Sequence, residues 1–194
     1  MIDNNVEYYN KNADAFCSGT VGVDMSPIRN KFIALLPDNA RVLDAGCGSG
    51  RDSRAFLEAG CEVVAFDASV EMCKRASKYL NQKVLQMRFE EMTFDNEFDG
   101  IWACASLLHV PMGELPAIML RMKEALKLGG VLYASFKYGE GIKMRGERKF
   151  SDFNERSVIP LFENAGFTVL KVVISSDGRV GREDEKWINV WGRK

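Results

Sequence analysis

The chain has 194 residues, and its 26 lysines and arginines nearly balance 27 aspartates and glutamates. This length is enough to bury a full core in one domain, and a hydrophobic content of 46% argues against a disordered or fibrous chain. A net charge of −1 argues against the large basic face that holds duplex DNA by phosphate neutralisation.

The cysteine and histidine content excludes two kinds of site. Five cysteines without a C-x-x-C pair, together with one histidine (His109), fit neither a disulfide framework nor a zinc site. The amino terminus has no basic run before an apolar stretch, and no apolar run approaches the roughly 20 residues that span a bilayer. We therefore expect a cytoplasmic protein with no membrane segment and no metal.

Two helical segments come first in chain order, at residues 5–16 and 26–36, and a glycine-containing stretch that we expect to be mobile joins them. Both precede the first strand and have no place in a sheet. We expect residues 1–38 to pack on the core or to cover a ligand crevice as a lid. Residues 39–194 then form the catalytic α/β core of a single domain.

Strands and helices alternate after residue 39, which predicts right-handed crossovers and a mainly parallel sheet. The last two strands are separated by too few residues for a crossover helix, so we expect them to pair as an antiparallel hairpin. The sequence predicts a doubly wound, Rossmann-like α/β fold. The predicted strands are 42–43, 62–66, 83–87, 98–103, 131–136, 167–175 and 185–191, and the predicted helices are 49–59, 69–80, 114–126 and 154–165.

The strongest chemical signal is the glycine turn VLDAGCGSG, which leads from the first strand into its helix. Gly46, Gly48 and Gly50 allow a tight turn and a close approach of the backbone to a ligand. Asp67 follows the second strand, where a carboxylate can accept both ribose hydroxyls of a nucleoside. Each feature alone is also compatible with an ordinary turn or helix cap, but together they favour a nucleoside site.

The charge of Asp44 favours one kind of cofactor. This residue lies two positions before the first glycine, where a dinucleotide would bring its doubly negative pyrophosphate and be repelled. S-adenosylmethionine instead presents an ammonium and a sulfonium. The spacing is G-x-G-x-G, with Arg51 where G-x-G-x-x-G requires its last glycine.

VLDAGCGSG, Asp67 after EVVAF, FDGIWACASLLHVP and LKLGGVLYASF together resemble the class I S-adenosylmethionine-dependent methyltransferases over about residues 40–136. The resemblance implies a seven-stranded sheet with a reversed last strand and S-adenosylmethionine across the strand ends. Many relatives have an aspartate where this chain has Arg88, at the start of the segment that frames the adenine. The cofactor-binding residues implied are Tyr9, Asp44, Gly46, Gly48, Gly50, Asp67, Ala68, Phe89 and Ala103.

Methyl transfer from a sulfonium is an in-line displacement that needs positioning and, for some acceptors, a base. His109 lies just past the fourth strand and is the candidate base, although it can equally be a structural residue that bonds a loop carbonyl. We expect a methyltransferase for a small-molecule acceptor, acting as a monomer or homodimer, with S-adenosylhomocysteine as product. The alternatives are an RNA methyltransferase that uses the basic stretch 137–149, otherwise a solvated loop, and a non-catalytic cofactor-binding protein or NAD-linked oxidoreductase.

Overall fold

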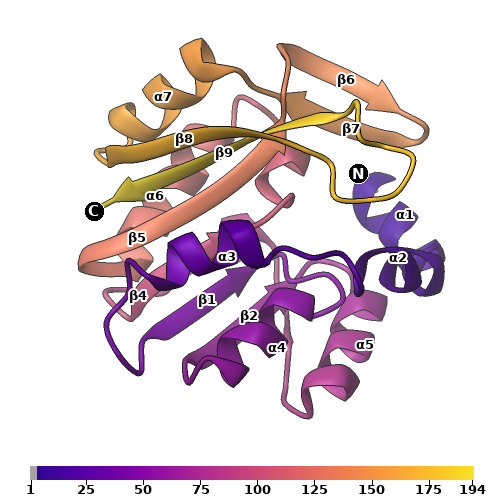
Figure 1. Cartoon of the computed structure of the whole chain (residues 1–194), viewed down its shortest axis with the longest axis horizontal. Helices are drawn as coiled ribbons and strands as arrows, with labels where there is room; N and C mark the ends of the chain where they lie inside the picture. Colours follow the sequence, from indigo (N-terminus) through magenta and orange to yellow (C-terminus); the bar gives the residue numbers. More distant parts are fainter. Residues whose placement is uncertain (1–3) are drawn as a thin grey trace.

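A computed structural model describes residues 4–194, and Figure 1 shows a twisted central sheet with helices on both faces. The seven strands lie in the order β3-β2-β1-β4-β5-β9-β8. β1 to β5 run parallel, and β9 pairs antiparallel with both β5 and β8. This confirms the predicted fold class, including the antiparallel hairpin at one edge. The strands are β1 Arg41–Ala45, β2 Glu62–Asp67, β3 Leu85–Gln86, β4 Phe98–Ala103, β5 Leu126–Lys137, β8 Thr168–Ser176 and β9 Lys186–Arg193.

Each face of the sheet has its own hydrophobic core. One core packs against α3 (Ser26–Ile33), α4 (Arg51–Glu58) and α5 (Val70–Leu80). The other packs against α6 (Leu115–Ala125) and α7 (Glu155–Asn164). The helices on both faces make the sheet interior fully buried, so the carboxyl ends of its parallel strands are left as the place for a ligand.

Stacked aromatic rings hold α3 to the middle of the sheet. The rings of Trp102 and Tyr133 stack with their centroids 3.9 Å apart, and Phe32 of α3 packs 5.2 Å from Trp102. The hydroxyl of Tyr133 donates to Oδ1 of Asn189 on β9 at 2.8 Å. This bond offsets the cost of burying the hydroxyl and ties the antiparallel strand to β5.

The amino-terminal region differs from the prediction. The segment expected as one helix over 5–16 is two helices, α1 (Asn4–Lys11) and α2 (Ala13–Thr20), which are broken at Asn12. The side chain of Asn12 donates to the backbone oxygen of Tyr8 at 2.8 Å and so ends α1 locally. Residues 17–20, expected in a mobile link, are the last turn of α2 and therefore are helical. No helix within residues 4–194 is long and apolar enough to cross a membrane.

The basic stretch 137–149 is not a solvated loop, which corrects that expectation. It contains the end of β5, then β6 (Gly141–Arg145) and the start of β7 (Arg148–Asp152), and β6 and β7 form an antiparallel hairpin. Gly146 turns the hairpin with φ +61°, a conformation that favours glycine. Phe150, Ser151 and Asp152 of β7 are buried, whereas β6 is largely exposed.

α1 spans from α5 to this hairpin and covers the carboxyl ends of the strands (Figure 1). At one end, Ser69, the N-cap of α5, donates its hydroxyl to Oδ1 of Asn10 at 2.6 Å. At the other end, the side-chain amide of Asn5 bonds the backbone N–H and C=O of Lys149, at 2.9 and 3.1 Å. α1 is thus fastened to elements on two sides. Residues 1–3 of the expected lid lie outside the described residues.

Candidate active site

A cavity of about 1380 Å³ opens at the carboxyl ends of the parallel strands, beneath α1 and α2. Its walls come from the glycine turn, the two amino-terminal helices, the β6–β7 hairpin and the β8–β9 connection. This volume exceeds what a drug-sized ligand fills, so a cofactor and a second small molecule fit side by side. The sequence-predicted site residues that line it are Tyr9, Asp44, Gly46, Gly48, Asp67, Ala68, Phe89 and His109.

Two sequence-predicted residues do not line the cavity. A Cβ built on Gly50 would lie 3.2 Å from Leu80 Cγ, so this glycine faces α5 and allows the glycine turn to pack against that helix. Ala103 is fully buried at the end of β4. The residues that follow it, Cys104 and Ala105, line the cavity instead.

Gly46, the first glycine of the turn, lies where a residue with a side chain would overlap its neighbours. Gly46 has φ +79°, and a Cβ on it would lie 2.5 Å from Cβ of Ser106. The backbone N–H groups of Gly46 and Cys47 both donate to the oxygen of Phe66 at 2.9 Å, which anchors the turn to β2. Ser106 in turn donates its hydroxyl to the oxygen of Ala45 at 2.7 Å. The turn and the loop after β4 are therefore locked against each other.

Replacing Gly46 with alanine is expected to destabilise the protein more than replacing Gly60, which separates steric overlap from backbone strain. Gly60 has φ +86° but no atom within 4 Å of its built Cβ, so Gly60→Ala should lower the free energy of unfolding only by the backbone strain, about 1–2 kcal/mol. Gly46→Ala adds the overlap with Ser106, typically about 1–3 kcal/mol more. Urea unfolding of both variants measures the difference, and equal losses would contradict the close packing of the turn.

Asp67 is held in place by two backbone groups. Its Oδ2 accepts from the N–H of Gly48 and its Oδ1 from the N–H of Ser69, each at 2.9 Å. Burial raises the pKa of the carboxyl group, and these backbone hydrogen bonds oppose that rise. The carboxylate therefore links the glycine turn to the start of α5 at the cavity wall, in a fixed orientation.

Asp44 is buried, with 2% of its surface exposed, and accepts a 2.5 Å hydrogen bond from the hydroxyl of Ser53. Burial first and the neighbouring Asp52 second raise the pKa of Asp44 to about 7. The sequence argument treats Asp44 as a fixed negative charge. In the free protein at neutral pH this carboxyl is instead close to half protonated, and a cationic ligand favours its ionised form.

Asp52 is a structural residue of the site that sequence reasoning missed. Its carboxylate pairs with Arg51 at 2.6 Å and Arg29 at 3.1 Å, and accepts from the indole N–H of Trp102 at 3.0 Å. It is buried, so both guanidinium groups and the indole are oriented by one anion. Arg51, which directly follows the glycine turn, lines the cavity as part of this network.

Phe89 forms the far wall on the β2 side. It begins a single 3₁₀ turn, Phe89–Glu91, and its ring packs edge-on against Phe66 at 5.3 Å. The turn is closed by a hydrogen bond of 2.8 Å from the N–H of Arg88 to Oε2 of Glu91. The backbone of Arg88 thus helps to close this turn. Phe89 lines the cavity at the place where the family resemblance implies that the adenine binds.

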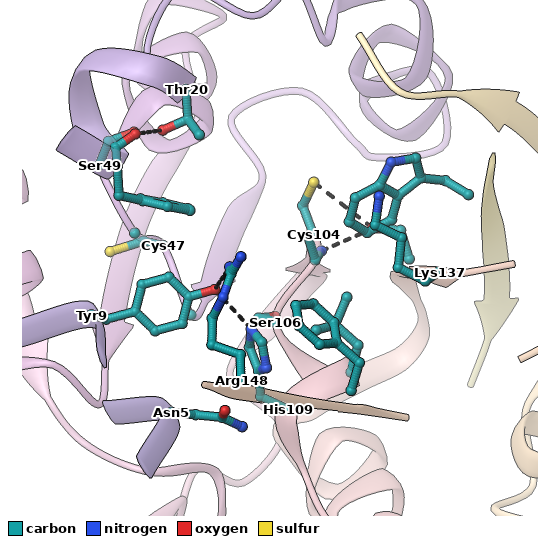
Figure 2. A pocket seen from close by; sticks show the side chains of 18 of the residues that line it. Asn5, Tyr9, Thr20, Cys47, Ser49, Cys104, Ser106, His109, Lys137 and Arg148 are labelled. Atoms are coloured by element: carbon teal, nitrogen blue, oxygen red, sulfur yellow. Dashed lines mark hydrogen bonds between the residues drawn. The ribbon is translucent and has the colours of Figure 1, made fainter. Parts of the chain in front are cut away.

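His109, Tyr9 and Arg148 meet in the middle of the cavity (Figure 2). Nδ1 of His109 lies 3.1 Å from the backbone oxygen of Lys149, and its Nε2 lies 2.8 Å from the Tyr9 hydroxyl. A carbonyl oxygen only accepts, so in the neutral ring Nδ1 carries the proton and Nε2 accepts from Tyr9. Arg148 donates Nη1–H to the same hydroxyl at 3.1 Å. Burial raises the pKa of Tyr9, and Arg148 opposes that rise.

The end of the cavity near Lys137 is polar, and its positive and negative side chains pair with one another. Lys137 is buried, pairs with Asp177 at 3.1 Å and with Glu185, and lies 4.0 Å from the ring centre of Trp187. Although burial raises it, hydrogen bonds from Arg179 and Trp187 hold the pKa of Asp177 well below its usual value. Lys137 begins the basic stretch 137–149 of the sequence analysis, but its acidic partners lie far along the chain and were missed.

Comparison with known proteins assigns the domain. Residues 42–130 match the family model of a methyltransferase domain. A ubiquinone biosynthesis O-methyltransferase from Xanthomonas axonopodis pv. citri is 30% identical over 120 residues, which cover 57% of this chain and 49% of that protein. The chain thus matches about half the length of this curated relative. The match identifies a methyltransferase domain over residues 42–130, which confirms the predicted resemblance to the class I S-adenosylmethionine-dependent methyltransferases.

Solved structures share the fold over almost the whole chain. A Burkholderia thailandensis 1,6-didemethyltoxoflavin N1-methyltransferase with bound S-adenosylhomocysteine has a TM-score of 0.81 at 23% identity, covering 98% of this chain and 85% of that one. The cyclase SpnF has a TM-score of 0.77 at 14% identity, covering 99% of this chain and 96% of that one. At these identities the likeness concerns the fold, and the second example is named for a different reaction.

Proposed function

We propose that this protein transfers a methyl group from S-adenosylmethionine to a small-molecule acceptor. The observation that carries this proposal is a single cavity that joins the nucleoside-binding edge at Asp67 to the Tyr9–His109 pair. The O-methyltransferase relative and the methyltransferase neighbour, which contains a small bound molecule beside S-adenosylhomocysteine, support a small acceptor. We also propose that residues 1–38 act as a cap on a single domain, in a monomer or homodimer.

The residues present fit this cofactor. Gly46, Cys47 and Gly48 line the cavity, so a ligand can lie directly on the backbone of the turn. Asp44 would face the ammonium of the amino-acid end, and Asp67 with Ala68 would hold the ribose. Phe89 would pack against the adenine. When bound, S-adenosylmethionine supplies a methyl group on a positively charged sulfur.

The residues of this chain then position the acceptor, exclude water and take up its proton. α1 and α2 cover the cavity, and the hydroxyl of Tyr9 already donates to Nε2 of His109. An acceptor hydroxyl or amine that reaches Tyr9 can pass its proton to the phenol oxygen as the phenol proton moves to Nε2. The positive imidazolium so formed stays bonded to the backbone oxygen of Lys149. His109 therefore acts on the acceptor through Tyr9.

His109→Ala is expected to slow methyl transfer by about 10²- to 10⁴-fold, the usual contribution of a general base, and to leave cofactor affinity unchanged. Tyr9→Phe removes the hydroxyl that links the histidine to the acceptor, so the double variant should be no slower than the slower single one. The separate values of kcat and KM, with calorimetry of S-adenosylhomocysteine, check this. A purely structural histidine would instead lower cofactor affinity and stability together, with additive losses.

We prefer a small molecule to RNA as the acceptor because carboxylates neutralise two basic residues of the stretch 137–149. Arg145 makes a bidentate pair with Asp152 at 2.6 and 2.8 Å, and Lys137 pairs with two carboxylates. To test this, S-adenosylmethionine with a labelled methyl group is incubated with a small-metabolite pool and, separately, with total tRNA. We expect label in the metabolite pool only. Label in tRNA, with a strong salt dependence, would favour the RNA alternative.

A further inference from the structure

Arg148 has an unusual environment for a cavity arginine. The other five arginines of the lining pair with carboxylates, whereas Arg148 has no carboxylate within 4 Å among residues 4–194. Its Nε–H is buried and has no hydrogen-bond partner within that part of the chain. The five paired arginines are Arg51 with Asp52, Arg88 with Glu90, Arg145 with Asp152, Arg179 with Asp177, and Arg182 with Glu185.

Aromatic rings hold the guanidinium in place without neutralising it. Its carbon lies 4.5 Å from the ring centre of Tyr8, 5.7 Å from that of Tyr9 and 5.1 Å from that of Phe150. Cation–π contacts and one bond to the phenol of Tyr9 orient the group, but they leave a net positive charge and an unused donor in the cavity. A guanidinium fork in this state is complementary to a planar anion.

The position of Arg148 identifies which molecule brings that anion. Arg51 is near enough to Asp44 for its charge to lower that pKa, so it lies at the end expected for the carboxylate of the methyl donor. Arg148 lies instead on β7 beside Tyr9 and His109 (Figure 2). The uncompensated guanidinium of Arg148 therefore lies next to Tyr9 and His109, the residues that would receive the acceptor's proton.

We propose that Arg148 is the specificity-determining residue of the acceptor site, and that the acceptor is a small organic anion bound through a carboxylate to its guanidinium. The proposal rests on the proposed function and names the substrate class of that site. Binding of the anion neutralises the one uncompensated arginine of the described cavity lining and places the adjacent acceptor atom next to Tyr9. Neutral analogues leave that charge unpaired in a half-buried site and bind more weakly.

Benzoate is a suitable probe because it combines a carboxylate with a ring that suits the aromatic surroundings, and benzamide is its neutral isostere. Calorimetry is carried out on the protein saturated with S-adenosylhomocysteine, at constant ionic strength. We expect saturable binding of benzoate, at least 10-fold weaker binding of benzamide, and at least a 10-fold loss of benzoate affinity in Arg148→Gln. Arg148→Lys, which keeps a point charge without the fork, should fall between.

Lys143→Gln is the matched control, because it removes one positive charge from the same hairpin at an exposed position. It should bind benzoate like the wild type. Affinity for S-adenosylhomocysteine should stay within about 2-fold in Arg148→Gln, which also shows that the variant is folded. 5′-Methylthioadenosine, which lacks the amino-acid end, distinguishes the two sources of a carboxylate.

Three outcomes would overturn the proposal. Benzoate that does not bind, or that binds wild type and Arg148→Gln equally, shows that Arg148 is not an anion site for the acceptor. A 10-fold loss of affinity for S-adenosylhomocysteine but not for 5′-methylthioadenosine would assign Arg148 to the methyl donor. If S-adenosylhomocysteine fails to bind the wild type, the proposed function itself fails, and this is recorded separately from the result with benzoate.

Discussion

Asp67→Ala is expected to weaken binding of S-adenosylhomocysteine by at least about 100-fold, because two charge-assisted hydrogen bonds to the ribose, about 1.5–3 kcal/mol each, are lost together. Part of the loss comes from the protein itself. The carboxylate accepts from the N–H groups of Gly48 and Ser69, so its removal also frees the glycine turn that the cofactor must lie on. Calorimetry with the purified variant measures the affinity.

The domain should remain folded, since Asp67 lies at the cavity wall and its burial raises its pKa, which makes the ionised group a cost to the free protein. Asp95→Asn, at an exposed position outside the cavity, is the control and should bind normally. An unchanged affinity in Asp67→Ala, with the control also unchanged, removes the ribose assignment.

Asp44→Asn is expected to abolish measurable binding of S-adenosylhomocysteine, because the contact with its ammonium group is lost. At pH 8 it is also expected to raise the stability of the free protein. The carboxyl has its pKa raised from 3.8 to about 7, so the folded state binds a proton more tightly than the unfolded state. Stability is therefore full below about pH 4 and falls as the pH rises towards 7. Asparagine keeps an acceptor for Ser53 and removes this loss, which amounts to up to about 4 kcal/mol.

The same shift predicts a pH dependence of cofactor binding. Below pH 7 the free protein holds a proton on Asp44 that an ammonium ligand must displace, so affinity should rise up to tenfold per pH unit and level off above pH 7. Thermal unfolding of both proteins between pH 5 and 8.5, and titration of S-adenosylhomocysteine over the same range, provide the two curves. A variant that is less stable than wild type at pH 8, or an affinity that falls with rising pH, contradicts the role of Asp44.

The sequence predicted the order of elements well where the hydrophobic pattern determines structure. β2 and β4 match the predicted strands within one residue, and the antiparallel hairpin follows from the short connection between the last two strands. Shorter or polar segments were harder. The stretch 137–149 has few buried residues of its own, because its hairpin is defined by the contacts of Asn5 with Lys149 and of Phe150 with the core, which are distant in sequence.

The site was predictable to the extent that its residues follow the strands directly. The glycine turn follows β1, Asp67 ends β2 and His109 lies in the loop after β4, and topology alone brings such residues to one edge. Arg148 was noted only as one member of the basic stretch 137–149, and Asp52 and Asp177 were missed, because their roles depend on which charges are left unpaired after folding. Asp44 was found, but its protonation depends on burial and on Asp52, and neither can be read from a motif.

The most direct test of the central claim, that this cavity binds S-adenosylmethionine at Asp67 and Asp44, compares thermal unfolding with S-adenosylhomocysteine and with NAD⁺ at pH 8. We predict that S-adenosylhomocysteine at 100 times its dissociation constant stabilises the wild type by about 2.7 kcal/mol, while NAD⁺ at the same concentration gives no stabilisation. Asp67→Ala should lose this stabilisation. Stabilisation by NAD⁺ and none by S-adenosylhomocysteine would contradict the account.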